Sequence, residues 1–351
     1  MRRNYKGKGE YFGTHRVIEP QGLLPQAATK VDNTPEIWSN EILIDVIALQ
    51  PTATAINEIK KRVGEDKEAI MQEIARIVEE EGKFQEPASK AGGMLIGRVK
   101  EIGEDLKDKV GDLKVGDKIA TLVSLSLKPI KIYEILDFDA YTEQVPCKAD
   151  AVLFESGIFT KIPDDLGQEL SLAIMDICGA PAQVAVNAKA GDTVVVMGAG
   201  KAGLLCLAEA KKRVAPTGKV VCMEYSEKAC ELVKDLGIAD VIIQCNGQKP
   251  LETYNKYKEV MGDELADFTV STVNVRDTEL STILVTKDTG KIYFFTMSTD
   301  FAKASLGCEG AKKYVTMVLG AGYYPGHAEI AFNIVREHAG LRQYLTDRYC
   351  K

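Results

Sequence analysis

The chain has 351 residues, of which 45% are hydrophobic and 27% are charged, and its formal net charge is -7. This length is long for a single domain, so two domains are expected. The mean hydropathy is -0.09, and no apolar run approaches the roughly 20 residues of a membrane-spanning helix. The net negative charge argues against a nucleic-acid-binding surface.

The cysteines indicate a reducing environment. There are eight of them, scattered through apolar segments, and no two form a C-x-x-C pair. Cysteines placed in this way are usually buried, reduced thiols rather than a disulfide framework. The first residues carry charge without an apolar segment behind them, so no secretory signal is expected. We therefore expect a cytoplasmic protein with neither a membrane partner nor a nucleic-acid partner.

The first half of the chain has the pattern of a β-rich unit. Residues 1–36 are interrupted by Pro and Gly and predict short strands and loops, and alternating Ile and Val predict a strand over 38–49. An apolar stripe predicts an amphipathic helix over 65–82. From Gly92 onward, short β-like runs separated by Gly-Asp turns predict more strands. Two of these are expected at 130–136 and 145–154.

After Gly179 the pattern changes to alternating strands and helices. Strands are expected at 193–197, 219–223, 241–244, 267–271, 290–296 and 315–319. Helices are expected at 201–213, 226–236, 250–262, 277–286 and 326–346. Short strands with intervening helices predict an α/β fold with a doubly wound parallel sheet of the Rossmann type.

A glycine motif lies directly after the first of these strands. The strand sequence TVVVM is followed by GAGKAG at 198–203, which is G-x-G-x-x-G between a strand and a helix. In a dinucleotide site Gly198 allows a tight turn, Gly200 leaves room for a pyrophosphate, and Gly203 allows the helix to pack on the strand. The N-terminus of the helix then offers N–H groups and a positive dipole to the phosphates.

The second strand of this half ends at an acidic residue, Glu224. A carboxylate at this position, roughly 20 residues after the glycines, binds the ribose hydroxyls of NAD and repels the 2′-phosphate of NADP. We therefore expect NAD, with NADP as the alternative if Tyr225, Ser226 and Lys228 together accommodate a phosphate. The expected cofactor contacts are Gly198, Ala199, Gly200, Lys201, Ala202, Gly203, Glu224, Tyr225, Ser226, Thr272, Thr296 and Met297.

Three further motifs resemble the medium-chain dehydrogenase/reductase superfamily. They are GRVKEIG at 97–103, LKVGDKI at 113–119 and AGDTV at 190–194. The resemblance implies a GroES-like catalytic domain, residues 1–175 and 321–351, a Rossmann domain, residues 176–320, and an active site where the two meet. It also implies a homodimer formed through residues 292–296.

The zinc ligands of that superfamily are missing. Its zinc-dependent members have Gly-His-Glu where this chain has Gly92, Gly93 and Met94, and their cysteine ligand corresponds to Thr52. Cys178 remains near the third ligand position. The histidines of this chain, His15, His327 and His338, are not at ligand spacing. We therefore expect no metal.

The whole chain is similar to a narrower family, the L-erythro-3,5-diaminohexanoate dehydrogenases of lysine fermentation. The similarity rests on GTHRVIEP at 13–20, LPQ at 24–26 and DICGAP at 176–181. It implies a small diamino acid substrate, which is oxidatively deaminated at C3 to 5-amino-3-oxohexanoate and ammonium with reduction of NAD(P).

Removing hydride from an amine carbon requires a neutral amine, and alkylamines have a pKa near 10, so the site needs a base. Asp176 is the first candidate base, with a structural ion pair as the equal alternative. Because it lies off the glycine loop, replacing it is expected to leave cofactor affinity nearly unchanged. Thr52 and Thr54 align with cleft positions of the superfamily and are candidates for holding the amine and the attacking water; helix capping is the alternative.

The remaining catalytic candidates are weaker. Cys178 is more often a buried thiol, and His15, together with Arg16, either meets the substrate carboxylate or lies on the surface. Glu155 is a further carboxylate. Two other functions remain open at this point, namely a zinc-free quinone or enoyl reductase and a nucleotide-binding protein without turnover.

Overall fold

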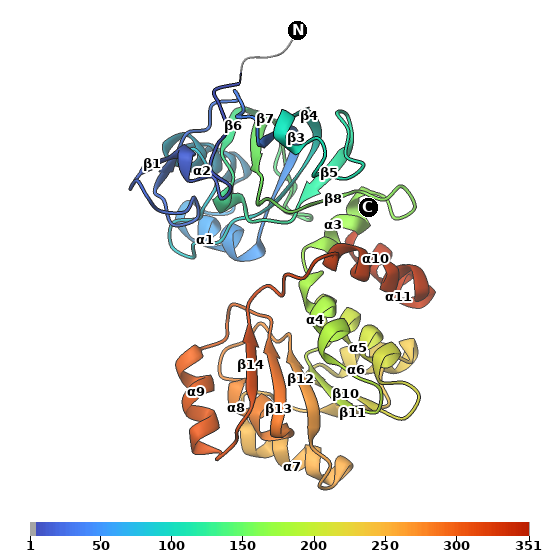
Figure 1. The fold of residues 1–351 in the computed structure, drawn as a ribbon. Coiled ribbons are helices and arrows are strands. Elements are labelled where there is room, and N and C mark those ends of the chain that lie inside the picture. Colours follow the sequence, from blue (N-terminus) through green and yellow to red (C-terminus); the bar gives the residue numbers. More distant parts are fainter. Residues whose placement is uncertain (1–4, 351) are drawn as a thin grey trace. The chain divides into compact units, whose positions relative to one another are not determined.

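The computed structural model describes residues 5–350. The chain divides into two compact units, Met1–Gln168 and Glu169–Lys351, and each has a six-stranded sheet of its own (Figure 1). The first unit is β-rich and the second is a doubly wound α/β unit, so the predicted fold class is confirmed.

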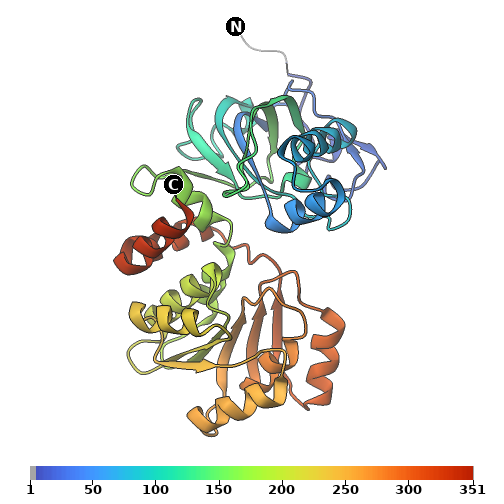
Figure 2. The same ribbon diagram turned by 180° about the vertical axis from the view of Figure 1, so that it is seen from behind.

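The first unit is built on an antiparallel sheet in the order β6-β7-β3-β4-β5-β8. Its strands are β3 (Glu41–Pro51), β4 (Gly93–Ile102), β5 (Lys118–Thr121), β6 (Ile130–Ile135), β7 (Val145–Phe154) and β8 (Phe159–Lys161). A separate two-stranded sheet pairs β1 (Val17–Glu19) with β2 (Lys30–Val31). Short 3-10 turns occur at Thr14–Arg16, Glu104–Leu106 and Leu125–Leu127. The helices α1 (Ala53–Val63) and α2 (Lys67–Glu81), both blue in Figure 2, pack against each other. The helix α2 also packs on β6.

The ends of α2 follow from its sequence. Asp66 caps the N-terminus because its Oδ1 accepts the Ala69 N–H at 2.9 Å. Gly82 ends the helix in the left-handed conformation, with φ of 73°. The apolar stripe between them, which includes Ile70 and Ile74, is buried in the core of the unit. The helix predicted over 65–82 is therefore confirmed.

The second unit is built on a parallel sheet in the order β11-β10-β9-β12-β13-β14. Its strands are β9 (Thr193–Met197), β10 (Lys219–Glu224), β11 (Val241–Gln244), β12 (Ala266–Ser271), β13 (Thr286–Phe294) and β14 (Thr316–Leu319). Its helices are α3 (Gln168–Met175), α4 (Gly179–Asn187), α5 (Lys201–Val214), α6 (Glu227–Leu236), α7 (Pro250–Met261), α8 (Glu279–Val285), α9 (Phe301–Gly310), α10 (His327–Glu337) and α11 (Ala339–Tyr349). All residues of β9 are buried, so both faces of the sheet are covered there.

The structure differs from the sequence prediction in several respects. The helices α3, α4 and α9 were not predicted, and the helix expected over 326–346 is two helices, α10 and α11. The segment 292–296 was expected to be a dimer-forming edge, but β13 pairs with β12 on one side and β14 on the other, so β14 is the outer strand. The tail 321–351 was expected to join the catalytic domain, but α10 packs on α4 and α5 of the second unit.

Within residues 5–350, no single helix is long and apolar enough to cross a membrane; α3 and α4, which are bent by 58° relative to each other, meet the length and composition test only as a pair.

Candidate active site

The glycine loop of the second unit has the geometry of a phosphate cradle. Gly198 leaves β9 with φ of 93°, a conformation that favours glycine. A side chain at Gly203 would begin 1.9 Å from the carbonyl oxygen of Gly198, so only glycine lets α5 pack this closely on the loop. Above Gly200 there is open space, and α5 starts directly after it with the Leu204 N–H bonded to the Gly200 oxygen. Because the first N–H groups of a helix have no partner within the helix, the loop fits a pyrophosphate.

Glu224, at the end of β10, faces the glycine loop. Its Oε2 accepts the N–H of Ala199 at 2.6 Å. Its Oε1 accepts the N–H groups of Tyr225 and Ser226, each at 2.8 Å. These bonds fix the carboxylate beside the loop and leave lone pairs that can accept hydroxyls. This is the position that the sequence predicts for a ribose-binding carboxylate.

A cavity of about 870 Å³ lies along the loop. Residues that were predicted from the sequence to bind the cofactor and that line it are Gly198, Ala199, Gly200, Glu224, Tyr225, Ser226 and Thr272. The cavity is also lined by Tyr344, Arg348 and Tyr349 of α11, which sequence reasoning did not find. Their only signal was a cationic and aromatic pattern far from the glycine motif, in a segment that was assigned to the other domain.

The predicted residues on later strands have different roles. The hydroxyl of Thr272 donates to the carbonyl oxygens of Met197 and Gly198, at 3.0 and 3.1 Å, so it holds the glycine loop in place. The hydroxyl of Thr296 donates to the Val273 oxygen at 2.9 Å, and Met297 is 90% exposed. Neither Thr296 nor Met297 lines the cavity.

Asp176 lies between α3 and α4 and forms an ion pair. Its Oδ2 is 3.0 Å from the Nζ of Lys201, the first residue of α5. The same ammonium lies 5.2 Å from the ring centre of Tyr349. The side chain of Asp176 is 43% exposed and that of Lys201 is 20% exposed, so solvent still reaches the proposed base. The ion pair that the sequence left as an alternative for Asp176 is therefore present.

Cys178 is buried at the start of α4. Burial, together with the nearby charge of Asp176, raises the pKa of its thiol to about 12. A thiol with this pKa is protonated at neutral pH. Because a cysteine acts as a base or a metal ligand only as the thiolate, Cys178 is not suited to either role.

Thr52 and Thr54 lie at the start of α1 in the first unit. Thr52 is the N-cap, because its Oγ1 accepts the Ala55 N–H at 3.2 Å. Its own N–H donates to the Gly92 oxygen at 3.0 Å. Thr54 is exposed in the first turn. The capping alternative thus holds for Thr52, whereas Thr54 is a solvent-exposed residue.

The position that corresponds to the histidine ligand of zinc-dependent relatives has a backbone conformation and surroundings that only glycine fits. Gly93 has φ of 133°, and a side chain there would begin 2.1 Å from the Gln50 oxygen. In the part of the chain that the structure describes, no group of three or more His, Cys, Asp or Glu side chains could hold a metal ion.

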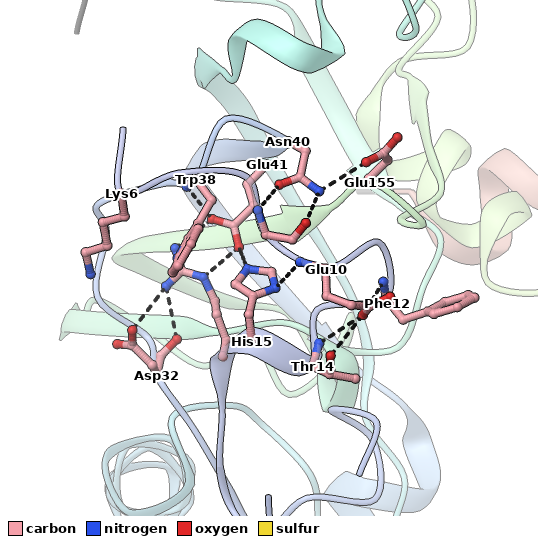
Figure 3. Close-up of polar contacts among 12 residues, drawn as sticks. Lys6, Glu10, Phe12, Thr14, His15, Asp32, Trp38, Asn40, Glu41 and Glu155 are labelled. Atoms are coloured by element: carbon pink, nitrogen blue, oxygen red, sulfur yellow. Dashed lines mark hydrogen bonds and ion pairs between the residues drawn. The ribbon is translucent and has the colours of Figure 1, made fainter. Parts of the chain in front are cut away.

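His15 and Glu41 lie in a polar network at the N-terminal end of the first unit (Figure 3), and Arg16 belongs to the same network through its bonds to Glu41. Arg16 is 1% exposed and forms a two-pronged ion pair with Glu41, with both N–O distances at 2.7 Å. Its remaining N–H groups donate to the backbone oxygens of Asp32, Thr34 and Glu36. Of the two alternatives that the sequence offered, the surface role is therefore wrong for Arg16, because every N–H of this guanidinium bonds within the protein.

His15 and Glu155 also form hydrogen bonds within the first unit. His15 accepts the Glu10 N–H at Nδ1, so its Nε2 carries the hydrogen and donates to Glu41 at 2.8 Å (Figure 3). Glu155 accepts from Asn40 at 3.1 Å and pairs with Lys109 at 2.6 Å. The hydrogen bonds from Lys109 and Asn40 lower the pKa of Glu155 below its usual value, which makes it a weaker base.

Comparison with known proteins identifies the family. A model of the L-erythro-3,5-diaminohexanoate dehydrogenase N-terminal domain matches residues 15–163. L-erythro-3,5-diaminohexanoate dehydrogenase of Acetoanaerobium sticklandii is 48% identical over 97% of this chain and 99% of its own length. The enzyme of the same name from Fusobacterium nucleatum is 47% identical with the same coverage. The chain belongs to the L-erythro-3,5-diaminohexanoate dehydrogenase family.

The fold has a wider distribution than this family. An alcohol dehydrogenase from Thermotoga maritima superimposes with a TM-score of 0.54 at 16% identity, covering 89% of this chain and 86% of that one. The likeness shows the medium-chain dehydrogenase fold. Together with the dehydrogenase family and the glycine loop, it indicates that the chain is an oxidoreductase that uses a nicotinamide cofactor.

Proposed function

We propose that this chain catalyses the oxidative deamination of L-erythro-3,5-diaminohexanoate to 5-amino-3-oxohexanoate and ammonium, with NAD as the oxidant. The observation that carries the proposal is the identity of 48% over nearly the full length of both chains with an enzyme of that name. In the balanced reaction the amine loses a proton, C3 loses a hydride and water adds to the resulting imine. Ammonium then leaves as the carbonyl forms.

The geometry of Glu224 supports NAD rather than NADP. The carboxylate is held beside the glycine loop by three backbone N–H groups, so a 2′-phosphate placed there would meet a fixed negative charge. Lys228 and Arg348 line the same cavity and are the groups that an NADP-binding mode would use. When bound, the nicotinamide supplies the hydride acceptor, and the chain binds and orients it.

We assign the proton transfer to Asp176. Its carboxylate lies close to the glycine loop through Lys201 and remains reachable from solvent, so it can attract a substrate ammonium and accept a proton from it. Thr54, an exposed residue of the first unit, stays a sequence-based candidate for holding the amine and the attacking water, and Thr52 is the N-cap of α1. Three candidates have no chemical role in this proposal. Cys178 is a buried thiol with a raised pKa, Glu155 is paired with Lys109, and His15 is bonded to Glu41.

We also propose a cellular location and an oligomeric state for this enzyme. All eight cysteines fall within the described residues and are unpaired thiols, which supports a reducing, cytoplasmic location. A homodimer is expected, and the outer strand β14 offers a surface for it, since Leu319 on that strand and Tyr314 just before it are exposed.

The test is steady-state turnover of the purified chain with L-erythro-3,5-diaminohexanoate, following reduced nicotinamide at 340 nm and ammonium release in parallel. Equal amounts of both products with NAD support the proposal. Parallel assays replace the diamino acid with the same concentration of an alcohol, an enone or a quinone. Turnover of one of these without turnover of the diamino acid would overturn the substrate assignment and leave the fold and the cofactor class intact.

A further inference from the structure

Lys201 occupies the boundary between the glycine loop and the proposed base. It follows Gly200 directly, as the first residue of α5, and Gly200 lines the cofactor cavity. Its ammonium pairs with Asp176 at 3.0 Å and lies 5.2 Å from the ring centre of Tyr349, a ring that also lines the cavity. Lys201 itself does not line the cavity, but its ammonium lies against the ring of Tyr349, a residue that does.

The ammonium of Lys201 can bind either of two anionic groups, the cofactor phosphates or the carboxylate of Asp176. The first residues of a helix after a glycine loop are where cofactor phosphates bind, and an ammonium on a flexible stem binds phosphate as a point charge. The other partner is the carboxylate of Asp176. Because both groups of the ion pair are partly exposed, the pair is weak enough to exchange one anion for another.

We propose that Lys201 is shared between Asp176 and the cofactor phosphates, so that Asp176 restrains cofactor binding and the bound cofactor loosens the hold of Lys201 on Asp176. Reciprocity of binding free energies requires both effects to have the same size. In the proposed reaction this releases the carboxylate once the oxidant is in place. Lys201 is thus a positioning residue that links the phosphate loop to the base. The inference rests on the proposed function only in giving Asp176 a proton to transfer.

The consequence is contrary to the expectation from sequence that replacing Asp176 leaves cofactor affinity unchanged. If the ammonium is shared, Asp176→Asn frees it for the phosphates, and NADH should bind about two- to fivefold more tightly, which corresponds to the strength of an exposed ion pair. Lys201→Met should weaken NADH binding about tenfold, as the loss of a charged contact to phosphate does. Lys201→Arg keeps the charge and should stay near the wild-type value.

The experiment measures the NADH dissociation constant of the full chain by fluorescence titration for Asp176→Asn, Lys201→Met and the double variant. The double variant separates sharing from simple repulsion between Asp176 and the phosphates. Sharing predicts that Asp176→Asn has no effect once Lys201 is Met, whereas repulsion predicts the same tightening in both backgrounds. Raising the salt concentration should diminish the gain in Asp176→Asn.

A matched control pair lies on the same helix. Lys212 of α5 pairs with Glu337 at 2.8 Å, and both side chains are about half exposed. Lys212→Met and Glu337→Gln should leave NADH affinity unchanged. An unchanged or weaker affinity in Asp176→Asn, or an equal gain in both backgrounds, would overturn the inference. Because affinity is measured without substrate, these outcomes are independent of whether the diamino acid is turned over.

Discussion

The carboxylate of Asp176 lies 3.0 Å from the ammonium of Lys201, and this contact joins the segment between α3 and α4 to the first turn of α5. The second unit therefore brings the proposed base next to the glycine loop, although the two are separated in sequence by β9. Both side chains of the pair remain partly exposed, so solvent reaches the proposed base.

If Asp176 accepts that proton, Asp176→Asn should lower kcat for deamination by about 10²- to 10⁴-fold, because an amide cannot act as the base. The measurement is steady-state turnover at saturating NAD, with Glu337→Gln as the control for loss of an exposed carboxylate on the same unit. Thr54→Ala should have a smaller effect, since water can replace a hydroxyl. A kcat of Asp176→Asn close to that of the wild type would remove this residue from the mechanism.

The position of Glu224 predicts the choice of cofactor. NAD should bind more tightly than NADP, and Glu224→Ala should weaken NAD binding about tenfold through loss of the ribose acceptor and of the bond to Ala199. NADP affinity should rise or stay unchanged in the same variant. Titration of both cofactors against both proteins checks this, and NADPH binding to the wild type as tightly as NADH would contradict it.

Activity should not depend on zinc. Elemental analysis should find no stoichiometric zinc, and activity should survive a chelator. Gly93→His should not create a metal site but should destabilise the first unit, because its backbone conformation and the nearby Gln50 oxygen exclude a side chain. Gly310→His is the matched control, since that glycine of α9 has open space around it. Zinc that is lost together with activity would contradict the prediction.

The thiol of Cys178 should not react with alkylating reagents in the folded protein and should take no part in turnover. With a pKa raised to about 12 by burial and by the charge of Asp176, only about one molecule in ten thousand carries the thiolate at pH 8. Iodoacetamide at pH 8 should leave Cys178 unmodified in the folded protein, as peptide mass analysis can show. Cys178→Ala should keep kcat within about tenfold of the wild type, and a larger loss would point to a chemical role.

The buried pair of Arg16 and Glu41 should matter for stability rather than for turnover. Glu41→Gln leaves the buried guanidinium without its charged partner and should lower the free energy of unfolding of the first unit by about 3–5 kcal/mol. Glu80→Gln, which removes an exposed partner of Arg76, should lower it by less than about 1 kcal/mol. Denaturant titration of the three proteins tests the difference.

The same pair has a pH dependence of known sign. Burial pushes the pKa of Glu41 upward, but hydrogen bonds from Arg16 and His15 and the charge of Arg16 outweigh it, so the net pKa is lowered from 4.5. A carboxyl with a lowered pKa in the folded state adds stability above its unfolded pKa and loses it as the pH falls through the folded value. The contribution of Glu41, measured as wild type against Glu41→Gln, should therefore be full near neutral pH and disappear as the pH falls below 4.5 through the lowered folded pKa.

Local signals in the sequence were sufficient for most of the elements. The start and end of α2 follow from Asp66 and Gly82, and the strands of the parallel sheet follow from short apolar runs between glycines and helices. The helix α9 was missed because its sequence, FAKASLGCEG, contains glycines and has little apolar periodicity. It is held instead by packing against α8.

The parts of the site that escaped prediction depend on contacts between distant segments. Arg16 was expected at the surface because charged residues usually lie there, and nothing near it in sequence reveals that Glu41 will neutralise it in the core. In the same way, the pairing of Asp176 with Lys201 and the presence of Arg348 in the cofactor cavity follow from tertiary packing. Local patterns identify the residue types that can act, but only the fold assigns their partners.

The place of α11 in the cofactor cavity also has a consequence for synthesis of the chain. Gly198 and Arg348 line the same cavity, yet at about 5–20 residues per second a ribosome adds the second about 8–30 seconds after the first. During that interval the glycine loop exists without Tyr344, Arg348 and Tyr349, the aromatic and cationic residues of α11 that line the cavity. Cofactor present in the cell can therefore stabilise the finished second unit, but it has only a partial cavity to bind on the growing chain.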